Sequence, residues 1–438
     1  MNHTITDRKK EIELLIQKHE TCWKDTSNQI WALAETKFEE FHSSRLQADV
    51  LESMGFQIAF PCKNLPTAFR ARYGTTAPVI GILGEFDALP NLGQEADCSE
   101  PNPLIQQDGT IKNGHGCGHH LLGCGAMAAA TAIKEYLETH HLPGSILYFG
   151  CPGEENGSGK ALMINAHFFD DIDIALSWHP DMKTCFWNQA LANLRVSYQF
   201  HGTSAHAAAC PHLGRSALDA CELMNVGVNY LREHVIPEAR IHYAYTNAGG
   251  TAPNIVPAEA ELFYAIRAPK DKDAHAIMER IHNIARGAAL MTDTTVTIEE
   301  KAHYQSFHNN SVLDQLIQQC LREYHPTTYS QEEMDYAVRF VPEASLTDSP
   351  MDLLPDYNQQ KAPAVSTDVG NVSHILPTSA FGIPCFANGN ILHSWQITAQ
   401  GKSSIAHKGM LTAAKILTAA AVEILEDEQL FAAIKNAF

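Results

Sequence analysis

The chain has 438 residues, of which 45% are hydrophobic and 18% are charged. This composition is typical of an ordinary globular protein rather than a disordered or membrane protein, and the length favours two domains. The formal net charge of −19 argues against nucleic acid or an anionic membrane surface as a partner, because such binding needs clustered Lys and Arg.

No targeting or membrane-spanning segment is evident in the sequence. The N-terminal residues include Arg8, Lys9 and Lys10 and lack the apolar centre of a signal peptide, and no apolar run reaches the ~18 residues of a membrane span. The 11 cysteines lack the paired spacings of a disulfide framework. We therefore expect a cytoplasmic protein in which most cysteines are buried thiols.

The first part of the chain predicts helices and then strands. Apolar residues at three- and four-residue steps predict helices within 7–54, and apolar runs predict three strands, over 56–60, 68–73 and 78–83. The last strand leads into Glu85 and Asp87. Residues i and i+2 of a strand share a face, so the two carboxylates are expected to point the same way, in either a ligand site or a solvated turn.

Histidine, cysteine and glycine are concentrated just before the next predicted helix, which covers 121–137. The segment 113–120 contains three histidines, one cysteine and three glycines. A thiolate at Cys117 and an imidazole at His119 are good ligands for zinc-like cations, and the glycines allow a tight turn. Two ligands do not make a site, so further ligands are expected elsewhere in the chain.

The next two predicted strands, 145–151 and 172–178, also end in polar residues. Glu154 and Glu155 follow the first strand in a glycine-rich turn, and His179 follows the second. Of two adjacent carboxylates, one can bind a metal while the other acts as a general base. Because ligand sites of open α/β sheets lie at the carboxyl ends of the strands, these residues favour one shared site.

From about residue 190 the pattern changes to strand, helix, two strands, helix and strand, the order of a ferredoxin-like fold. Flanking α/β segments indicate that this domain, 190–306, is inserted into a domain formed by 1–189 and 307–438. Two of its loops, over 201–206 and 249–254, are rich in glycine and small polar residues, which suits ordinary turns as well as function.

The α/β pattern resumes with a helix over 311–321. The segment 366–371 predicts the start of a helix, with Asp368 placed to complement the helix dipole. His393 is the last histidine in a strand-to-loop setting before the C-terminal helices.

Together these motifs resemble the M20 family of dinuclear metallohydrolases, in the aminoacylase-like branch that contains bacterial p-aminobenzoyl-glutamate hydrolases and plant auxin-conjugate amidohydrolases. The resemblance covers nearly the whole chain. It implies an α/β zinc-peptidase-like catalytic domain, with a mixed sheet flanked by helices, and an inserted α+β ferredoxin-like lid or dimerisation domain. It also implies two divalent metal ions per chain, held by Cys117, His119, Glu155, His179 and His393.

The same resemblance assigns roles in catalysis. Glu154 would be the general base, and Asp87 would orient a ligand such as His119. His206 and Asn254 of the lid would reach the site of the partner chain in a homodimer and polarise the scissile carbonyl.

Two further residues are candidate substrate contacts. Arg267 could pair with a substrate carboxylate, although a structural role at the end of its strand is equally compatible with the sequence. Asp368 lies in the loop that corresponds to a substrate loop of the family.

The implied reaction is hydrolysis of N-acyl or N-aroyl amino acids, such as aroyl-glutamates, or of small dipeptides. A pair of cations lowers the pKa of water from ~15.7 towards neutrality and so supplies a hydroxide. A thiolate ligand favours zinc, whereas the other ligands also suit manganese or cobalt. The alternatives are a strict dipeptidase or carboxypeptidase, and a non-catalytic component of a hetero-oligomeric hydrolase. Retention of Glu154 argues against the second.

The chain departs from the branch in two places. His120 stands where many members have Asp after the ligand histidine, and neither His115 nor His120 receives a role from the resemblance. The loop 366–373 lacks the Glu-Asp-Phe of many aminoacylases and is closer to the B-type subunits of p-aminobenzoyl-glutamate hydrolases.

Overall fold

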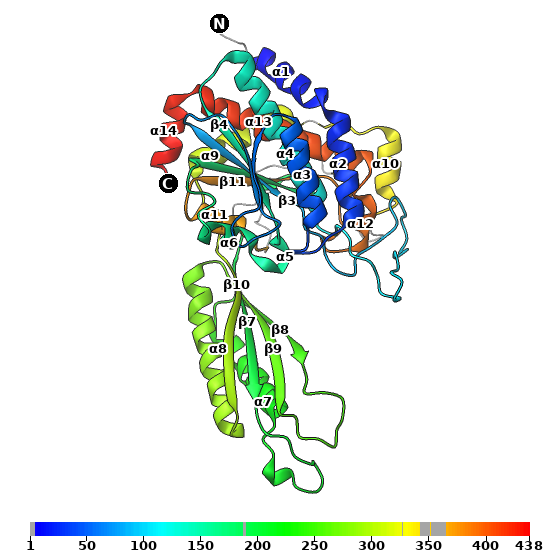
Figure 1. Ribbon diagram of the computed structural model, residues 1–438, viewed down its shortest axis with the longest axis vertical. Helices are drawn as coiled ribbons and strands as arrows, with labels where there is room; N and C mark the ends of the chain where they lie inside the picture. Colours follow the sequence, from blue (N-terminus) through cyan, green and yellow to red (C-terminus); the bar gives the residue numbers. More distant parts are fainter. Residues whose placement is uncertain (1–4, 187–189, 326, 342–350, 352–364) are drawn as a thin grey trace. The chain divides into compact units, whose positions relative to one another are not determined.

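The computed structural model describes residues 5–186, 190–325, 327–341, 351 and 365–438 and divides into two compact units (Figure 1). The first unit consists of Met1–Gln189, His308–Pro363 and Asn371–Phe438, and the second of Ala190–Phe307 and Ala364–Gly370. Each unit has its own hydrophobic core.

A seven-stranded mixed sheet forms the centre of the first unit. Its order is β1 (Gln57–Ala59), β2 (Phe69–Tyr73), β4 (Ser145–Cys151), β3 (Val79–Glu85), β5 (Ile174–Asp181), β11 (Thr378–Pro384) and β6 (Cys185–Phe186). Strands β4, β3, β5 and β11 are parallel, and the outer strands pair antiparallel. The predicted mixed sheet is confirmed.

The parallel strands are buried on both faces, as their nearly continuous apolar sequences predict. Helices α4 (His119–His140) and α13 (Ser404–Glu426) pack together against the sheet, and their residues are buried on almost every side. The other helices of this unit are α1 (Ile5–Lys18), α2 (Glu20–Leu33), α3 (Phe41–Ser53), α5 (Glu154–Gly157), α6 (Gly159–Asn165), α9 (Ser311–Tyr324), α10 (Gln331–Val338), α12 (Trp395–Gln400) and α14 (Glu428–Asn436) (Figure 1).

Two boundaries differ from the predictions and matter for the site. Helix α4 begins at His119, so this histidine lies in the first turn of the helix rather than in the loop before it. Strand β5 continues through His179 to Asp181, because β11 pairs with it as far as Asp181. His179 is therefore a strand residue.

The second unit is the predicted ferredoxin-like fold. Its four antiparallel strands have the order β10 (Thr295–Tyr304), β7 (Ala192–His201), β9 (Glu259–Ala268) and β8 (Arg240–Asn247). Helices α7 (Ala217–Leu231) and α8 (Asp271–Thr292) pack against each other and on this sheet, with short turns at η1 (Pro211–Leu213) and η2 (Arg232–His234). Alternating burial along β9 gives the sheet one core-facing side. Helix α11 spans Val369–Ser373.

Candidate metal centre

The candidate ligands of the first unit come from one edge of the central sheet. Strands β3, β4 and β5 are parallel neighbours, so their carboxyl ends meet there. Asp87 follows β3, Glu154 and Glu155 follow β4, and His179 lies near the end of β5. His393 lies in the loop between β11 and α12 at the same edge, because its backbone N–H donates to the Gly116 carbonyl at 2.7 Å.

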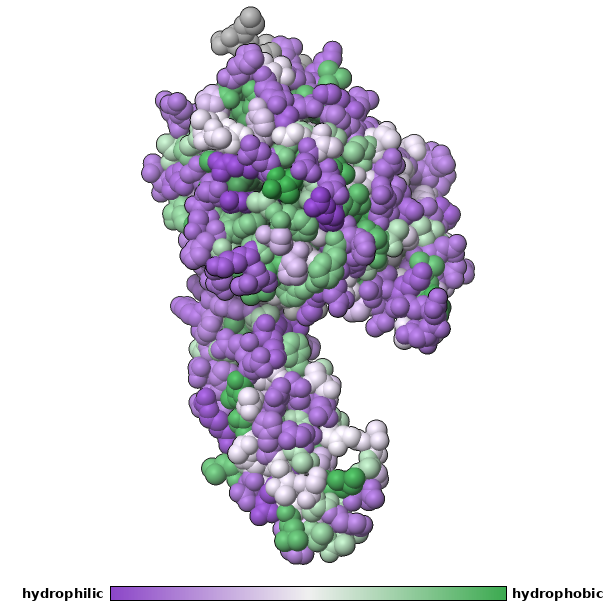
Figure 2. Space-filling view, in the orientation of Figure 1, coloured by the Kyte–Doolittle hydropathy of each residue, from purple (hydrophilic) through white to green (hydrophobic). Residues whose placement is uncertain are grey.

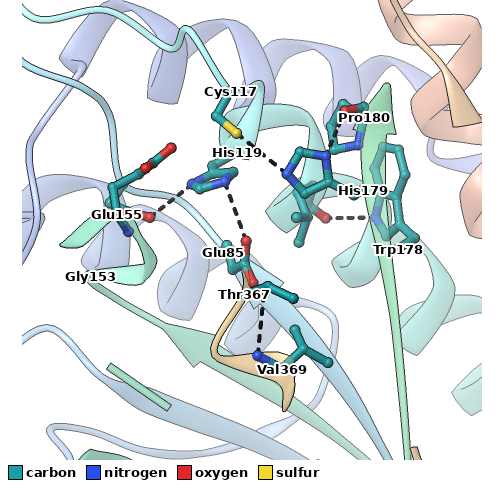
Figure 3. A network of polar contacts seen from close by, with 12 residues as sticks. Glu85, Cys117, His119, Gly153, Glu155, Trp178, His179, Pro180, Thr367 and Val369 are labelled. Atoms are coloured by element: carbon teal, nitrogen blue, oxygen red, sulfur yellow. Dashed lines mark hydrogen bonds and ion pairs between the residues drawn. The ribbon is translucent and has the colours of Figure 1, made fainter. Parts of the chain in front are cut away.

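Cys117 lies between two sets of possible ligands. Ligand atoms of Cys117, His119 and His179 lie within 4.8 Å of one another, and so do those of Cys117, Glu155 and His393. Figure 3 shows Cys117 and His179 pointing toward each other, with 3.4 Å between Sγ and Nε2. The structure thus brings together all five predicted ligands, with the sulfur common to both sets.

Hydrogen bonds fix which nitrogen of each buried histidine is available. His179 Nδ1 donates to the Pro180 carbonyl at 2.6 Å, which leaves the Nε2 lone pair directed at Cys117. His119 Nδ1 lies 2.9 Å from Asp87 Oδ1, and its Nε2 is buried without a hydrogen-bond partner among the described residues. A buried nitrogen that makes no hydrogen bond in the described part of the chain, beside a thiol and the Glu85 carboxylate at 3.3 Å, suits a bound cation.

Asp87 holds two candidate ligands with one carboxylate. Its Oδ1 faces His119, and its Oδ2 accepts the backbone N–H of Glu155 at 2.8 Å. Burial alone would raise the pKa of Asp87, but His119, the Glu155 N–H and Lys160 keep this pKa below its usual value. Asp87 therefore remains a carboxylate, as a group that orients ligands must.

Two of the candidate ligands form an ion pair at the outer part of the centre. Glu155 Oε1 lies 3.0 Å from Nε2 of His393, a half-exposed residue in the left-handed region with φ of 65°. Hydrogen bonds to Cys117 and Glu155 raise the pKa of His393 to about 11. The arrangement attracts positive charge, which a divalent ion would supply.

A model of the peptidase family M20/M25/M40 matches residues 81–348, more than half of the chain. The chain belongs to this family. It is 42% identical over 449 residues to the B-type subunit of p-aminobenzoyl-glutamate hydrolase from Escherichia coli (strain K12), covering 96% of this chain and 92% of that protein. It is 30% identical over 428 residues to the Xaa-Arg dipeptidase of Mus musculus, covering 94% and 88%. The chain is therefore a hydrolase acting on amide bonds, as predicted.

Solved structures share the M20 fold. The aminobenzoyl-glutamate utilization protein from Klebsiella pneumoniae has a TM-score of 0.60 at 17% identity, with 90% of this chain and 96% of that chain covered. A dinuclear metal binding peptidase from the M20 family of Bacillus subtilis has a TM-score of 0.61 at 15% identity, with 94% and 99% covered. The predicted fold class is confirmed.

The predicted lid residues of this M20 protein lie close together on exposed loops of the second unit. The Ala207 N–H donates to the Asn254 carbonyl at 3.0 Å, and His206 forms an antiparallel bridge with Ile255. His206 Nδ1 accepts the N–H groups of Ala208 and Ala209 at 3.2 Å. A neutral His206 with Nδ1 as acceptor carries its proton on Nε2, which is then a hydrogen-bond donor.

The two candidate substrate contacts also belong to the second unit. Arg267 lies on β9, and its Nη1 donates to Ser366 Oγ at 3.4 Å. Asp368 is fully buried, just before α11. At the start of this helix, the Val369 N–H donates to Thr367 Oγ1 at 3.2 Å (Figure 3).

The two unassigned histidines of the 113–120 segment are structural anchors. His115 Nε2 lies 3.1 Å from the Ile30 carbonyl, and His120 Nε2 lies 2.8 Å from the Gly401 carbonyl. Their rings pack with centroids 4.8 Å apart, and burial lowers the pKa of both. They tie the Cys117 loop to α2 and to the end of α12.

One buried ion pair beside the centre is not evident from sequence. Glu85 Oε1 accepts a hydrogen bond from Lys160 Nζ at 2.5 Å, and Glu85 Oε2 lies 3.3 Å from His119 Nε2. Atoms of Glu85, His119 and Glu154 lie within 4.8 Å of one another. The strand-end position of Glu85 predicts a site residue, whereas Lys160 carries no local signal because its partner is 75 residues away.

Proposed function

We propose that the chain is a metal-dependent amidohydrolase that uses two divalent ions to cleave N-aroyl or N-acyl amino acids such as p-aminobenzoyl-glutamate. The observation that carries this proposal is the position of Cys117 between the two ligand sets. Because both sets include the same thiolate, they suit two neighbouring ions better than two ions at independent sites. The 42% identity to the B-type subunit of p-aminobenzoyl-glutamate hydrolase supports the choice of substrate.

The residues present fit such a pair of ions. Cys117, His119 and His179 would hold one ion, and Cys117, Glu155 and His393 the other. Zinc, manganese and cobalt all suit this mixture of sulfur, nitrogen and oxygen ligands. Bound divalent ions supply Lewis acidity, lowering the pKa of water towards neutrality.

The positions of the remaining residues support the following roles. Glu154 lies beside the ligand His119 and accepts the proton of the attacking water, then donates it to the leaving amine. Asp87 holds His119 and the turn of Glu155 in place. Arg267 would pair with a substrate carboxylate; Asp368, which is fully buried, stays a predicted substrate contact.

We propose that residues 190–306 form a lid and dimerisation domain, and that 1–189 and 307–438 form the catalytic domain. Edge strand β8 is largely exposed, and apolar side chains of α7 reach the surface, with Val226 50% exposed. Figure 2 shows hydrophobic side chains on the surface of the second unit. His206 and Asn254 of one chain would polarise the scissile carbonyl in its partner.

The partner chain is a second copy of this protein or a related chain of the same family. The p-aminobenzoyl-glutamate hydrolase of Escherichia coli is named as having an A-type and a B-type subunit, and the A-type subunit matches half of this chain at 27% identity. Analytical ultracentrifugation of the purified chain distinguishes a homodimer from a monomer that awaits a different partner.

The helices and the cysteines bear on the compartment of the protein. No helix within the described residues is both long and apolar enough to cross a membrane. All 11 cysteines are free thiols, which supports the proposal of a reducing, cytoplasmic location.

A substrate panel tests the proposal against the dipeptidase alternative, which the similarity to an Xaa-Arg dipeptidase favours. The zinc- or manganese-loaded protein is assayed on p-aminobenzoyl-glutamate, other N-acyl amino acids and dipeptides with C-terminal Arg. Preference for aroyl-glutamate supports the proposal, and preference for the dipeptides supports the alternative. Metal-loaded protein that is inactive on all of these amides would contradict both the proposal and the alternative.

A further inference from the structure

The segment Glu35–Glu40, between α2 and α3, lies next to both groups of carboxylates of the metal centre, which are Asp87 and the Glu154–Glu155 pair. The Ala88 N–H donates to the Glu35 carbonyl at 2.8 Å, and Thr36 and Ala88 form a parallel bridge. This pairing places the segment alongside the residue that follows Asp87. The remaining residues of the segment reach the turn that carries Glu154 and Glu155.

Phe38 occupies the space that two glycines of this turn leave open. A Cβ atom on Gly153 would lie 2.5 Å from the Phe38 ring, and one on Gly157 would lie 2.7 Å from it. These glycines flank the Glu154–Glu155 pair. Phe38 itself has φ of 62°, in the left-handed region that phenylalanine rarely adopts. Such strain persists only where surrounding structure holds it, and it is concentrated at functional sites.

Glu40 holds the same turn by a hydrogen bond. Its side chain is fully buried, and its Oε1 accepts the backbone N–H of Gly153 at 2.9 Å. Gly153 directly precedes Glu154. Burial and the negative charge of Asp87 raise the pKa of Glu40 to about 8. A buried carboxyl group is costly, so its presence here needs a reason beyond packing.

We propose that Glu40 and Phe38 are positioning residues that set the direction of Glu154 and Glu155 through the Gly153 turn. For Glu154 the inference rests on the proposed function, in which that residue is the base. For Glu155 it requires only metal binding. A misplacement of about 1 Å at a reacting group can cost ~100-fold in rate, so a single hydrogen bond behind the turn is enough to matter.

Two conservative substitutions separate positioning from general stability. Glu40→Gln keeps an acceptor oxygen at the same reach, while Glu40→Asp withdraws it by about 1.5 Å, one carbon–carbon bond. The matched control is Glu333→Asp. Glu333 is also a buried glutamate that accepts a backbone N–H, from Ser330 at 2.8 Å, and it lies at the start of α10.

The full-length chain of each variant is measured for zinc affinity by chelator competition, for kcat and KM on p-aminobenzoyl-glutamate, and for Tm. We expect Glu40→Asp to lose about tenfold in zinc affinity and about 10- to 100-fold in kcat, with KM close to wild type. Glu40→Gln and Glu333→Asp should match wild type in zinc affinity and kcat. If Glu40→Asp does not fold, Phe38→Leu, which shortens the ring over the glycines, should show the same losses.

The outcomes separate this inference from the proposed function. Wild-type zinc affinity and kcat in folded Glu40→Asp, or equal losses in Glu40→Gln and Glu40→Asp, would overturn the positioning role even if Glu154→Gln is inactive. A wild-type chain without hydrolase activity would overturn the proposed function. In that case a zinc-affinity loss confined to Glu40→Asp still supports positioning of Glu155.

Discussion

Most candidate metal ligands of the first unit are buried, apart from the half-exposed His393, whereas the two candidate hydrogen-bond donors of the second unit are exposed. Cys117, His119 and His179 are at most 6% exposed, whereas His206 and Asn254 lie on exposed loops. Buried metal-ligating side chains are oriented by packing and by partners such as Asp87, so their geometry is fixed before a metal ion binds. The exposed donors are accessible to another molecule.

This difference indicates that the two units have different roles. The first unit supplies a rigid, negatively charged centre, whose side chains are costly to bury without a cation. The second unit presents a hydrogen-bond donor at its surface. If the proposed function is right, changes in the first unit alter chemistry and metal binding within one chain, whereas changes at His206 act on a partner chain.

The largest effect is expected from Glu154→Gln. Removal of a general base typically costs ~10² to 10⁴ in rate, so kcat should fall by at least 100-fold. Zinc content, measured by elemental analysis, should stay at the wild-type level because Glu154 is absent from both ligand sets around Cys117. Unchanged kcat would remove Glu154 from the mechanism and favour the non-catalytic alternative.

The next largest effect is expected from His206→Ala. Loss of one donor to a developing oxyanion costs ~10² to 10³ in kcat in other enzymes. Zinc affinity should not change, since the ligand sets lie in the first unit. Mixed dimers of His206→Ala and Glu154→Gln chains should regain activity well above either single variant. If verified mixed dimers stay at the single-variant level, the donor does not act across the dimer.

Asp87→Asn tests whether this carboxylate orients the buried ligands of the first unit. The amide can accept from Glu155 N–H or from His119, but it lacks the charge that holds the His119 tautomer. Loss of such an orienting carboxylate typically lowers metal affinity ~10- to 100-fold. Chelator competition measures this loss, with Glu333→Gln as a buried control. Wild-type affinity in Asp87→Asn would mean that packing alone orients His119.

Much of the centre could be predicted because its residues follow apolar runs. Asp87, Glu155 and His179 each come at the end of a buried strand, and parallel strands unite such ends at one edge. Glu40 and Lys160 could not be found in this way. Their partners, Gly153 and Glu85, are 113 and 75 residues away, and only the folded chain brings them together.

The smallest effect is expected on the free energy of unfolding after a substitution in an exposed loop. Surface substitutions away from caps and buried contacts usually change the free energy of unfolding by less than about 0.5 kcal/mol, so Asn254→Ala should unfold like the wild-type protein. His119→Ala removes a buried ring beside Asp87 and should cost more than about 1 kcal/mol, because Asp87 then loses a partner. Urea unfolding of metal-free chains compares the two. Equal losses would show that the lid loops are as constrained as the metal centre, and the contrast between rigid ligands and free donors would fail.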